Sequence, residues 1–203
     1  IAALIGTNTL IPGKICNRAG SSEGLNLCTG KPVAGEKIRT LPSVISGLWN
    51  ASVLLTSSGK RFSDYKTELE KEYGETLSYR QVTEQSLADK TSQGYKIMQN
   101  LAFCVRDGLH ILEKAANENH IPCSKEITIT GGQAKSPAWV QMKADISGRT
   151  FTETALPDAE LLGDAVLAYA GLGIYKSIQE AADSLVKIGR KFTPAENFAN
   201  IKS

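Results

Sequence analysis

The sequence contains few residues of the kinds that bind metals or form disulfides. Its 203 residues include two histidines and four cysteines, and no two cysteines have C-x-x-C spacing. Neither His110 nor His120 has a second potential ligand at metal-binding spacing, so no metal site is expected from them. Three of the cysteines lie in apolar segments, which favours buried reduced thiols over disulfides and therefore a cytoplasmic protein.

Long apolar runs and a strong excess of one charge are also missing. No apolar run approaches the length of a membrane span and no signal-peptide pattern opens the chain, so no membrane association is expected. The net charge is +2 without a basic stripe, so nucleic acid is not an expected partner. What remains, 41% apolar and 22% charged residues, is the ordinary composition of a globular protein with enough residues for a full core.

A strand followed by a glycine turn and a helix is the most informative local pattern. Residues 127–130 predict a strand, which Gly131 and Gly132 end. Ser136 followed by Pro137 then predicts a helix start. Glycines let the backbone approach a ligand closely, and free N–H groups at a helix start favour an anion or a polar group. Many α/β proteins use such a turn without a ligand, so a purely structural interpretation stays open.

A second turn of small residues lies near the start of the chain. Residues 14–19 and 25–28 predict two short strands, and residues 20–24 (Gly-Ser-Ser-Glu-Gly) join them. A turn of this composition often does no more than reverse the chain. The same residues can present backbone amides and two hydroxyls to a phosphate group.

The remaining pattern predicts helices and strands in an α/β protein. The strongest helix is expected at residues 94–117, whose apolar residues recur at intervals of three and four and predict a buried face. Residues 75–93 are polar with some helical character, and residues 191–203 form a polar tail, so the domain is expected to span residues 1–190. Further strands are expected at residues 48–56 and 151–155, the latter at a sheet edge, and further helices at residues 1–6, 60–73, 136–148, 157–171 and 177–188.

Three stretches resemble the carboxy-terminal domain of FGGY-family carbohydrate kinases, the group that includes xylulokinase, glycerol kinase, ribulokinase and gluconate kinase. They are residues 18–26 (RAGSSEGLN), 131–139 (GGQAKSPAW) and 162–165 (LGDA), and they occur in the family's order. The resemblance implies an α/β fold of the actin-like ATPase (ribonuclease H-like) class, with a mixed sheet flanked by helices. It also implies ATP-dependent transfer of a γ-phosphoryl group to a hydroxyl of a sugar or polyol, with ATP and Mg²⁺ as cofactors.

Carried over by matching positions, the resemblance implies a nucleotide site on this chain. The turn of small residues would hold the β- and γ-phosphates, the start of the helix at residues 60–73 would flank the nucleotide, and the glycine turn would contact the ribose and purine. The nucleotide-binding residues implied in this way are Gly20, Ser21, Ser22, Gly59, Ser63, Gly131, Gly132, Gln133 and Ser136.

Two departures from the family limit what this chain is expected to do. The family's catalytic aspartate would fall two positions before Ile1, and the domain with most sugar contacts would also precede it. The chain by itself is therefore expected to supply no catalytic residue or metal ligand and to be inactive. Residues 75–93 also contain no apolar run for a strand that family members usually have there, which leaves open a sheet that lacks one central strand.

Two alternatives remain beside the kinase interpretation. The first is a non-catalytic actin-like module that acts in partner binding or oligomerisation, and a homodimer is considered for the kinase domain as well. The second is an unrelated α/β domain with incidental glycines, which would have to match three motifs in the right order by chance. The identity of the sugar is not specified by these residues.

Overall fold

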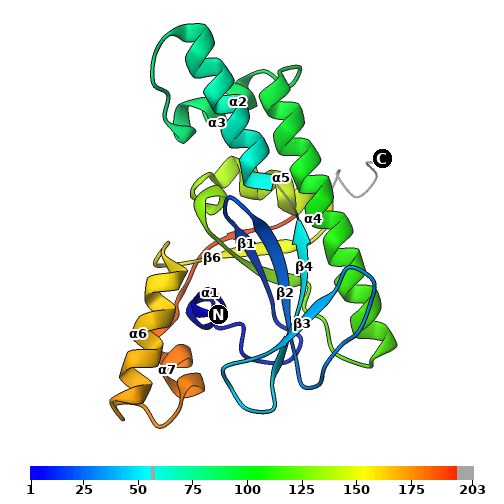
Figure 1. Cartoon of the computed structure of the whole chain (residues 1–203), viewed down its shortest axis with the longest axis vertical. Coiled ribbons are helices and arrows are strands. Elements are labelled where there is room, and N and C mark those ends of the chain that lie inside the picture. Colours follow the sequence, from blue (N-terminus) through cyan, green and yellow to red (C-terminus); the bar gives the residue numbers. More distant parts are fainter. Residues whose placement is uncertain (56–57, 196–203) are drawn as a thin grey trace.

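The structure, a computed structural model, describes residues 1–55 and 58–195 and contains a mixed seven-stranded β-sheet (Figure 1). The strands are β1 (Ile15–Ala19), β2 (Glu23–Thr29), β3 (Arg39–Pro42), β4 (Trp49–Leu55), β5 (Glu126–Thr130), β6 (Thr150–Thr154) and β7 (Ile188–Phe192). They lie in the order β3-β4-β2-β1-β5-β6-β7. β1, β5 and β6 run parallel, whereas β2, β4 and β3 extend the sheet on one side, and β7 on the other, by antiparallel pairing.

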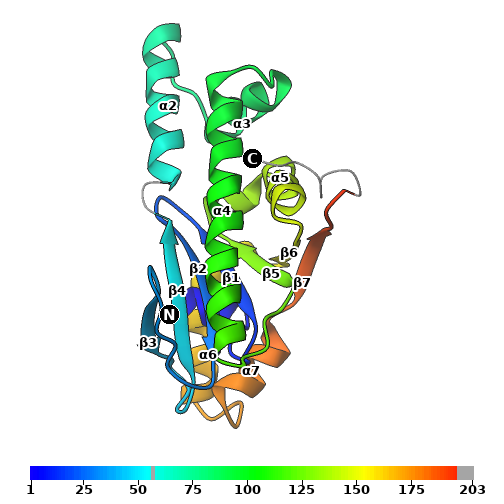
Figure 2. The ribbon, with the colours of Figure 1, turned by 90° about the vertical axis from the view of Figure 1, so that its right-hand side faces the viewer.

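Helices cover both faces of the sheet and extend beyond one end of it. The helices are α1 (Ala2–Gly6), α2 (Ser58–Tyr73), α3 (Tyr79–Ala88), α4 (Gln93–Glu118), the 3-10 turn η1 (Gly132–Lys135), α5 (Pro137–Ser147), α6 (Ala159–Gly171) and α7 (Ile178–Leu185). α4 and α5 pack on one face, and α1, α6 and α7 lie on the other (Figures 1 and 2). α2 and α3 pack against the first half of α4 and project beyond the sheet.

The helix α4 confirms the prediction of a long amphipathic helix at residues 94–117. Ser92 caps its start by accepting a hydrogen bond from the N–H of Tyr95 at 3.1 Å. Its apolar face contributes Val105, Leu109 and Leu112 to the main core, together with buried side chains of the sheet. None of the described helices combines the length and the apolar character needed to cross a membrane.

The sheet has no vacant central position among the described residues. β5 lies between β1 and β6, so the expectation that one central strand could be lacking is wrong. Residues 75–93 contain α3 instead, and its Val82 packs with Leu101 and Trp139 in a separate core cluster. The sequence suggested a loss because a strand was sought before α4, whereas the strand that pairs with β1 follows α4.

The last described residues also differ from the expected tail. β7 pairs with β6, so residues 151–155 are not a sheet edge, and the sheet extends beyond residue 190. The helix expected at residues 177–188 ends at Leu185. No pattern in the sequence indicated β7, because only Phe192 of its five residues is buried. Residues 196–203 of the expected tail, and residues 56 and 57 between β4 and α2, lie outside the described residues.

Glu70 links α2 to the segment that leads into α3. Its carboxylate accepts hydrogen bonds from Lys66 Nζ at 2.6 Å and from the N–H of Leu77 at 2.9 Å, and both hydrogen bonds lower the pKa of Glu70. Because the pKa is lower in the folded state, the ionised carboxylate stabilises the fold above its unfolded-state pKa of about 4.3. This stabilisation is lost as the pH falls through the depressed pKa.

We therefore expect Glu70→Gln to make the free energy of unfolding less dependent on pH under acidic conditions. Between about pH 5 and about pH 3, urea titrations should show a smaller decrease in the free energy of unfolding for this variant than for the wild type. Glu72→Gln, at an exposed position of the same helix, is the control and should follow the wild type. Equal slopes for Glu70→Gln and the wild type would contradict the assigned role.

Candidate functional site

The turn between β1 and β2 is the point at which three segments of the chain meet. Gly20, Ser21 and Ser22, called here the small-residue hairpin, connect the antiparallel pair in which Ala19 lies opposite Glu23. Both serines are exposed. Their hydroxyls, which can donate and accept hydrogen bonds, are therefore open to a ligand.

The glycine turn, residues 131 and 132, lies against the small-residue hairpin. β1 and β5 are parallel neighbours with Arg18 opposite Thr130, so the chain leaves both strands at the same edge of the sheet. Gly131 has a φ of 100°, and a Cβ added there would lie 2.6 Å from the carbonyl oxygen of Ala19. A Cβ added to Gly132 would meet nothing within 4 Å, so this residue faces open space. The two bends predicted from the sequence are therefore in direct contact.

The start of α2 also packs on the small-residue hairpin. A Cβ added to Gly59 would lie 2.3 Å from the carbonyl oxygen of Gly20 and 2.7 Å from the Cα of Ser21. Real Cβ atoms do not approach other atoms so closely, so only glycine allows this packing. The first N–H groups of a helix have no partner within the helix, and α2 thus brings backbone donors to the hairpin.

The three remaining predicted residues lie in different surroundings. Gln133 is buried, and its Nε2 donates a hydrogen bond to Glu23 Oε2 at 3.3 Å. Ser136 caps the start of α5 with its side chain, as predicted. Ser63 accepts a hydrogen bond from the hydroxyl of Tyr79 at 3.0 Å and is thus engaged with α3. The structure joins the hairpin, Gly59 and the glycine turn, whereas Ser63 is tied to a different element.

A buried ion pair that the sequence did not indicate lies inside the protein next to the hairpin. Lys143 of α5 and Glu23 of β2 are both fully buried, and Lys143 Nζ lies 2.5 Å from Glu23 Oε1. Asn17 Nδ2 donates to the same oxygen at 2.9 Å, and Gln133 donates to the other. Burial lowers the pKa of Lys143, and the charge of Glu23 opposes this shift. The network connects β1, β2, η1 and α5 directly behind the two bends.

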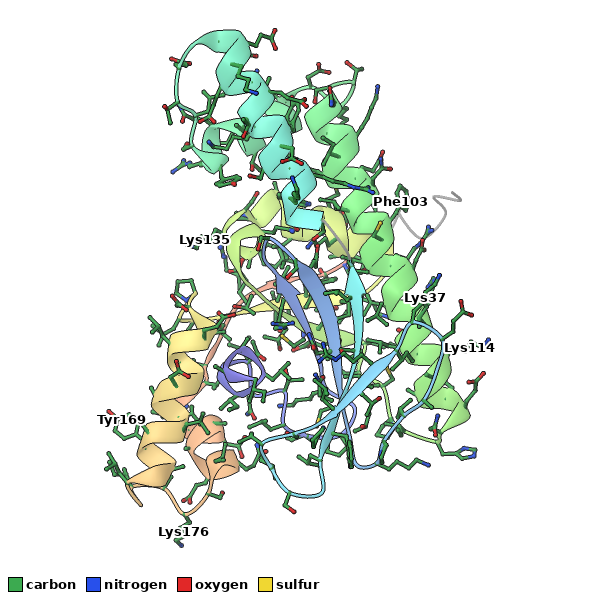
Figure 3. All side chains as sticks on the ribbon, in the orientation of Figure 1. Lys37, Phe103, Lys114, Lys135, Tyr169 and Lys176 are labelled. Carbon is green, nitrogen blue, oxygen red and sulfur yellow. The ribbon has the colours of Figure 1, made fainter. Side chains whose placement is uncertain are left out.

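Three buried polar atoms near the meeting point have no hydrogen-bond partner in the described part of the chain. They are Ser58 Oγ at the start of α2, Thr130 Oγ1 at the end of β5 and Gln133 Oε1. Buried polar atoms normally have a partner, which a ligand or a water molecule can supply. A cavity of about 240 Å³ adjoins the glycine turn at the ends of β5 and β6, and Lys135 is one of its lining residues. Figure 3 labels Lys135 among the side chains of the whole chain.

The cysteines are free thiols, as the sequence pattern favoured. Burial raises the pKa of Cys16, Cys28 and Cys123 to about 11, so these thiols stay protonated at neutral pH, whereas Cys104 is exposed. Within residues 1–55 and 58–195, no group of three or more histidine, cysteine, aspartate or glutamate side chains is arranged to hold a metal ion.

Part of the chain, including the glycine turn, is similar in sequence to known carbohydrate kinases. Residues 78–172 match the sequence model of the FGGY family of carbohydrate kinases, C-terminal domain. A xylulose kinase of Bacillus subtilis is 28% identical over 108 residues, which cover 53% of this chain and 21% of that protein. An autoinducer-2 kinase of Salmonella typhimurium is 35% identical over 74 residues, which cover 36% of this chain and 14% of that protein. Residues 78–172 are therefore similar in sequence to an FGGY carboxy-terminal domain.

Solved structures of low sequence identity show that the chain has the fold predicted from the sequence. A xylulose kinase from Rhodospirillum rubrum matches with a TM-score of 0.77 and 16% identity, over 97% of this chain and 46% of that chain. Plasmodium falciparum glycerol kinase with ADP matches with a TM-score of 0.76 and 15% identity, over 95% of this chain and 45% of that chain. The α/β fold is thus that of an actin-like ATPase domain, and the chain spans less than half of these kinases.

The FGGY sequence match covers only part of the candidate site, whereas the structure describes all of it. The matched residues include the glycine turn, Gln133 and Ser136, but they begin after the small-residue hairpin and Gly59. The contacts of Gly59 and Gly131 with the hairpin connect the unmatched part to the matched part.

Proposed function

We propose that this chain supplies the nucleotide-binding side of an ATP-dependent carbohydrate kinase, which transfers the γ-phosphoryl group of ATP to a hydroxyl of a sugar or polyol. The observation that supports the proposal is the contact of the small-residue hairpin with both the glycine turn and the start of α2. Three sources of free backbone donors meet there. Phosphoryl transfer depends mainly on positioning and on donors around developing charge, which such a site can supply.

In this proposal the three segments bind different parts of the nucleotide. The amides and hydroxyls of the small-residue hairpin hold the β- and γ-phosphates, with the N–H groups at the start of α2 beside them. The exposed backbone of Gly132 contacts the ribose and purine. The unpartnered buried oxygens of Ser58, Thr130 and Gln133 fit a polar ligand or its waters at this place. Mg²⁺ is held by the phosphates and by groups outside this chain, in keeping with its preference for oxygen ligands.

The proposal assigns the catalytic base and most sugar contacts to residues outside these 203. The chain is then a nucleotide-binding unit that transfers no phosphoryl group by itself. The alternative of a non-catalytic module rests on the polar residues 75–93 in place of a strand, whereas the described sheet is continuous. We therefore retain the kinase proposal as the one that the structure supports best.

Introducing a negative charge into the hairpin tests the proposal. In isothermal titrations with Mg²⁺, the wild-type chain should bind ADP, and Ser21→Asp should bind it about tenfold more weakly because a carboxylate near 4 Å from a phosphate costs about 1 to 4 kcal/mol. AMP binding should change much less. Ser46→Asp, which adds the same charge to the exposed loop between β3 and β4, is the matched control.

Two results of these experiments would contradict the proposal. If the folded wild-type chain shows no saturable ADP binding, this chain is not a nucleotide-binding unit. If pure chain releases ADP from ATP in a sugar-dependent way, the catalytic base lies within these residues and the assignment of the chemistry to other residues is wrong.

A further inference from the structure

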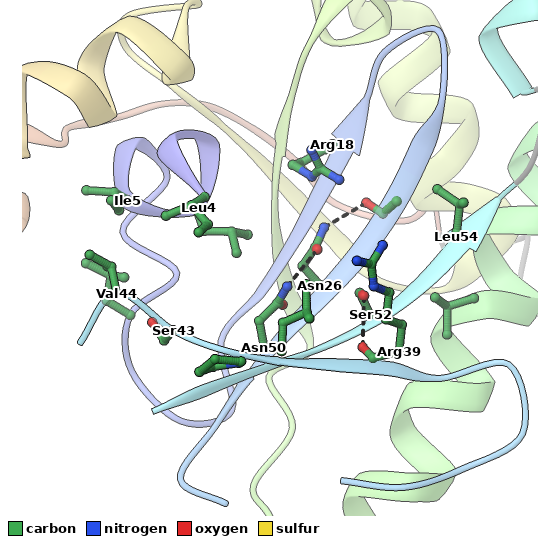
Figure 4. Close-up of a pocket in the computed structure, with 16 residues that line it drawn as sticks. Leu4, Ile5, Arg18, Asn26, Arg39, Ser43, Val44, Asn50, Ser52 and Leu54 are labelled. Carbon is green, nitrogen blue, oxygen red and sulfur yellow. Dashed lines mark hydrogen bonds between the residues drawn. The ribbon is translucent and has the colours of Figure 1, made fainter. Parts of the chain in front are cut away.

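A second hollow lies on the opposite face of the sheet from α4, between α1 and the strands β2, β4 and β3 (Figure 4). Its volume is about 190 Å³. One wall is apolar and includes Leu4, Ile5 and Val44. The other side is polar and includes Arg18, Asn26, Arg39, Asn50 and Ser52. We call the whole hollow the arginine hollow.

The register of the strands explains why these side chains share one face. Paired residues on neighbouring antiparallel strands project from the same side of a sheet. Arg18 on β1 lies opposite Gly24, and Arg39 on β3 lies opposite Ser52, which in turn lies opposite Asn26. The two arginines therefore reach over the same strip of sheet from strands that are separated by β2 and β4, as Figure 4 shows.

A glycine leaves the floor of the arginine hollow open. A Cβ added to Gly24 would lie 3.4 Å from Arg18 Nη2, so the guanidinium of Arg18 extends over this residue. A larger side chain at this position would fill the space in front of the guanidinium. The floor beside it is polar, because Asn50 Nδ2 donates to Asn26 Oδ1 at 3.3 Å, and Asn50 Oδ1 is buried without a partner among the described residues.

The hollow is lined by two arginine side chains and by no acidic side chain among the described residues. In the part of the chain that the structure describes, neither Arg18 nor Arg39 forms an ion pair or a side-chain hydrogen bond through its guanidinium. Four other arginines form ion pairs with acidic side chains, Arg80, Arg106, Arg149 and Arg190, whereas the exposed Arg61 forms none among the described residues. Two guanidiniums that face a common hollow without an acidic partner are available to donate hydrogen bonds to an anion there.

We propose that the arginine hollow is a binding site for a small organic anion, a carboxylate or a phosphate monoester, with Arg18 and Arg39 as its charged ligands. The planar guanidinium can donate two parallel hydrogen bonds to either group. The apolar wall contacts the carbon chain of the ligand.

The place of the hollow suggests what the anion does. Arg18 and the small-residue hairpin are separated only by Ala19, so the hollow and the hairpin lie along the same strand. If the proposed kinase function holds, the anion is the acidic group of the phosphoryl acceptor or the phosphate of the product. This assignment rests on the proposed function, whereas binding of the anion does not.

Nuclear magnetic resonance of the side-chain Nε–H groups of arginine tests the site in the intact 203-residue chain. The probes are gluconate as the carboxylate, glycerol 3-phosphate as the phosphate monoester and sorbitol as a neutral polyol. We expect the anions to shift the Nε–H signals of Arg18 and Arg39 in a saturable way and sorbitol to leave them unchanged. The tighter of the two anions shows whether the site prefers a carboxylate or a phosphate.

Removal of either arginine charge should weaken binding of the anions without affecting the fold. Arg39 is exposed, and Arg39→Gln should lower the affinity about tenfold or more, because the substitution removes a hydrogen bond between charged groups. Arg18→Gln should have an effect of the same size. Arg80→Gln, which removes an exposed arginine of α3, should leave the affinity unchanged.

The same titrations distinguish the outcomes. The inference is overturned if neither anion shifts both arginine signals, or if Arg39→Gln binds the anions as the wild type does. Anion-induced shifts that are confined to the amides of residues 20–22 would place the anion on the hairpin and likewise overturn it. A separate titration with MgADP, followed on those amides, reports on nucleotide binding, so failure of the kinase proposal is seen independently.

Discussion

Replacement of Lys143 by methionine is expected to lower the free energy of unfolding by about 3 to 5 kcal/mol, as is typical when one partner of a buried ion pair is removed. Lys143 and Glu23 are both fully buried at a separation of 2.5 Å. Methionine fills much of the same volume but leaves the carboxylate of Glu23 without a counter-charge. Urea or thermal unfolding followed by circular dichroism measures the loss.

Two further variants separate the lost charge from the lost packing. The double variant Glu23→Gln with Lys143→Met removes both charges. The new amide oxygen can accept from Asn17, and the new NH2 group can donate to Gln133 Oε1 once that amide turns over, so most of the stability should return. Arg149→Met breaks the partly exposed pair with Glu113 at the opposite end of the parallel strands and should cost about 1 kcal/mol or less. If Lys143→Met is no less stable than Arg149→Met, the buried pair does not stabilise the fold.

The sequence could have indicated one member of the buried ion pair but not the other. The helix that contains Lys143 was predicted, and its buried face includes Trp139, Val140 and Ala144. Lys143 lies four residues after Trp139 and therefore on the same face, which is a signal that the helical period alone could have given. Its partner could not be found in this way. Glu23 is separated from Lys143 by 120 residues, and only the packing of α5 on the sheet brings the two together.

The elements that were predicted well are those whose patterns are local. A long apolar face identifies α4, and a serine followed by proline identifies the start of α5. The continuity of the sheet is not local, because β5 pairs with β1 across a long stretch of sequence that contains three strands and three helices. β7 is exposed along most of its length and has no alternating pattern to detect. The arginine hollow was missed for the same reason, since Arg18 and Arg39 face a common hollow only once the register of the intervening strands is known.

Replacement of Gly131 by alanine is expected to destabilise the fold by about 3 kcal/mol, through backbone strain and a steric clash that act together. The φ of 100° is unfavourable for any residue with a Cβ, and the added methyl group would lie 2.6 Å from the carbonyl oxygen of Ala19. That carbonyl belongs to the backbone of β1 and has little freedom to move. Chemical denaturation measures the loss, and ADP titration of the folded variant should show weaker binding because the two bends are forced apart.

The adjacent residue provides the matched control and separates folding from binding. Gly132→Ala adds a methyl group that meets no atom within 4 Å, and its φ is not positive, so its stability should stay within about 0.5 kcal/mol of the wild type. If the backbone of this turn contacts the purine, the same methyl group stands in the way of the ligand, and ADP should bind about tenfold more weakly although the fold is intact. A stable Gly132→Ala variant with wild-type ADP affinity would show that the open side of the glycine turn is not where the nucleotide lies. The pair of substitutions thus assigns Gly131 to the contact between the two bends and Gly132 to the contact with the ligand, from adjacent positions in the chain.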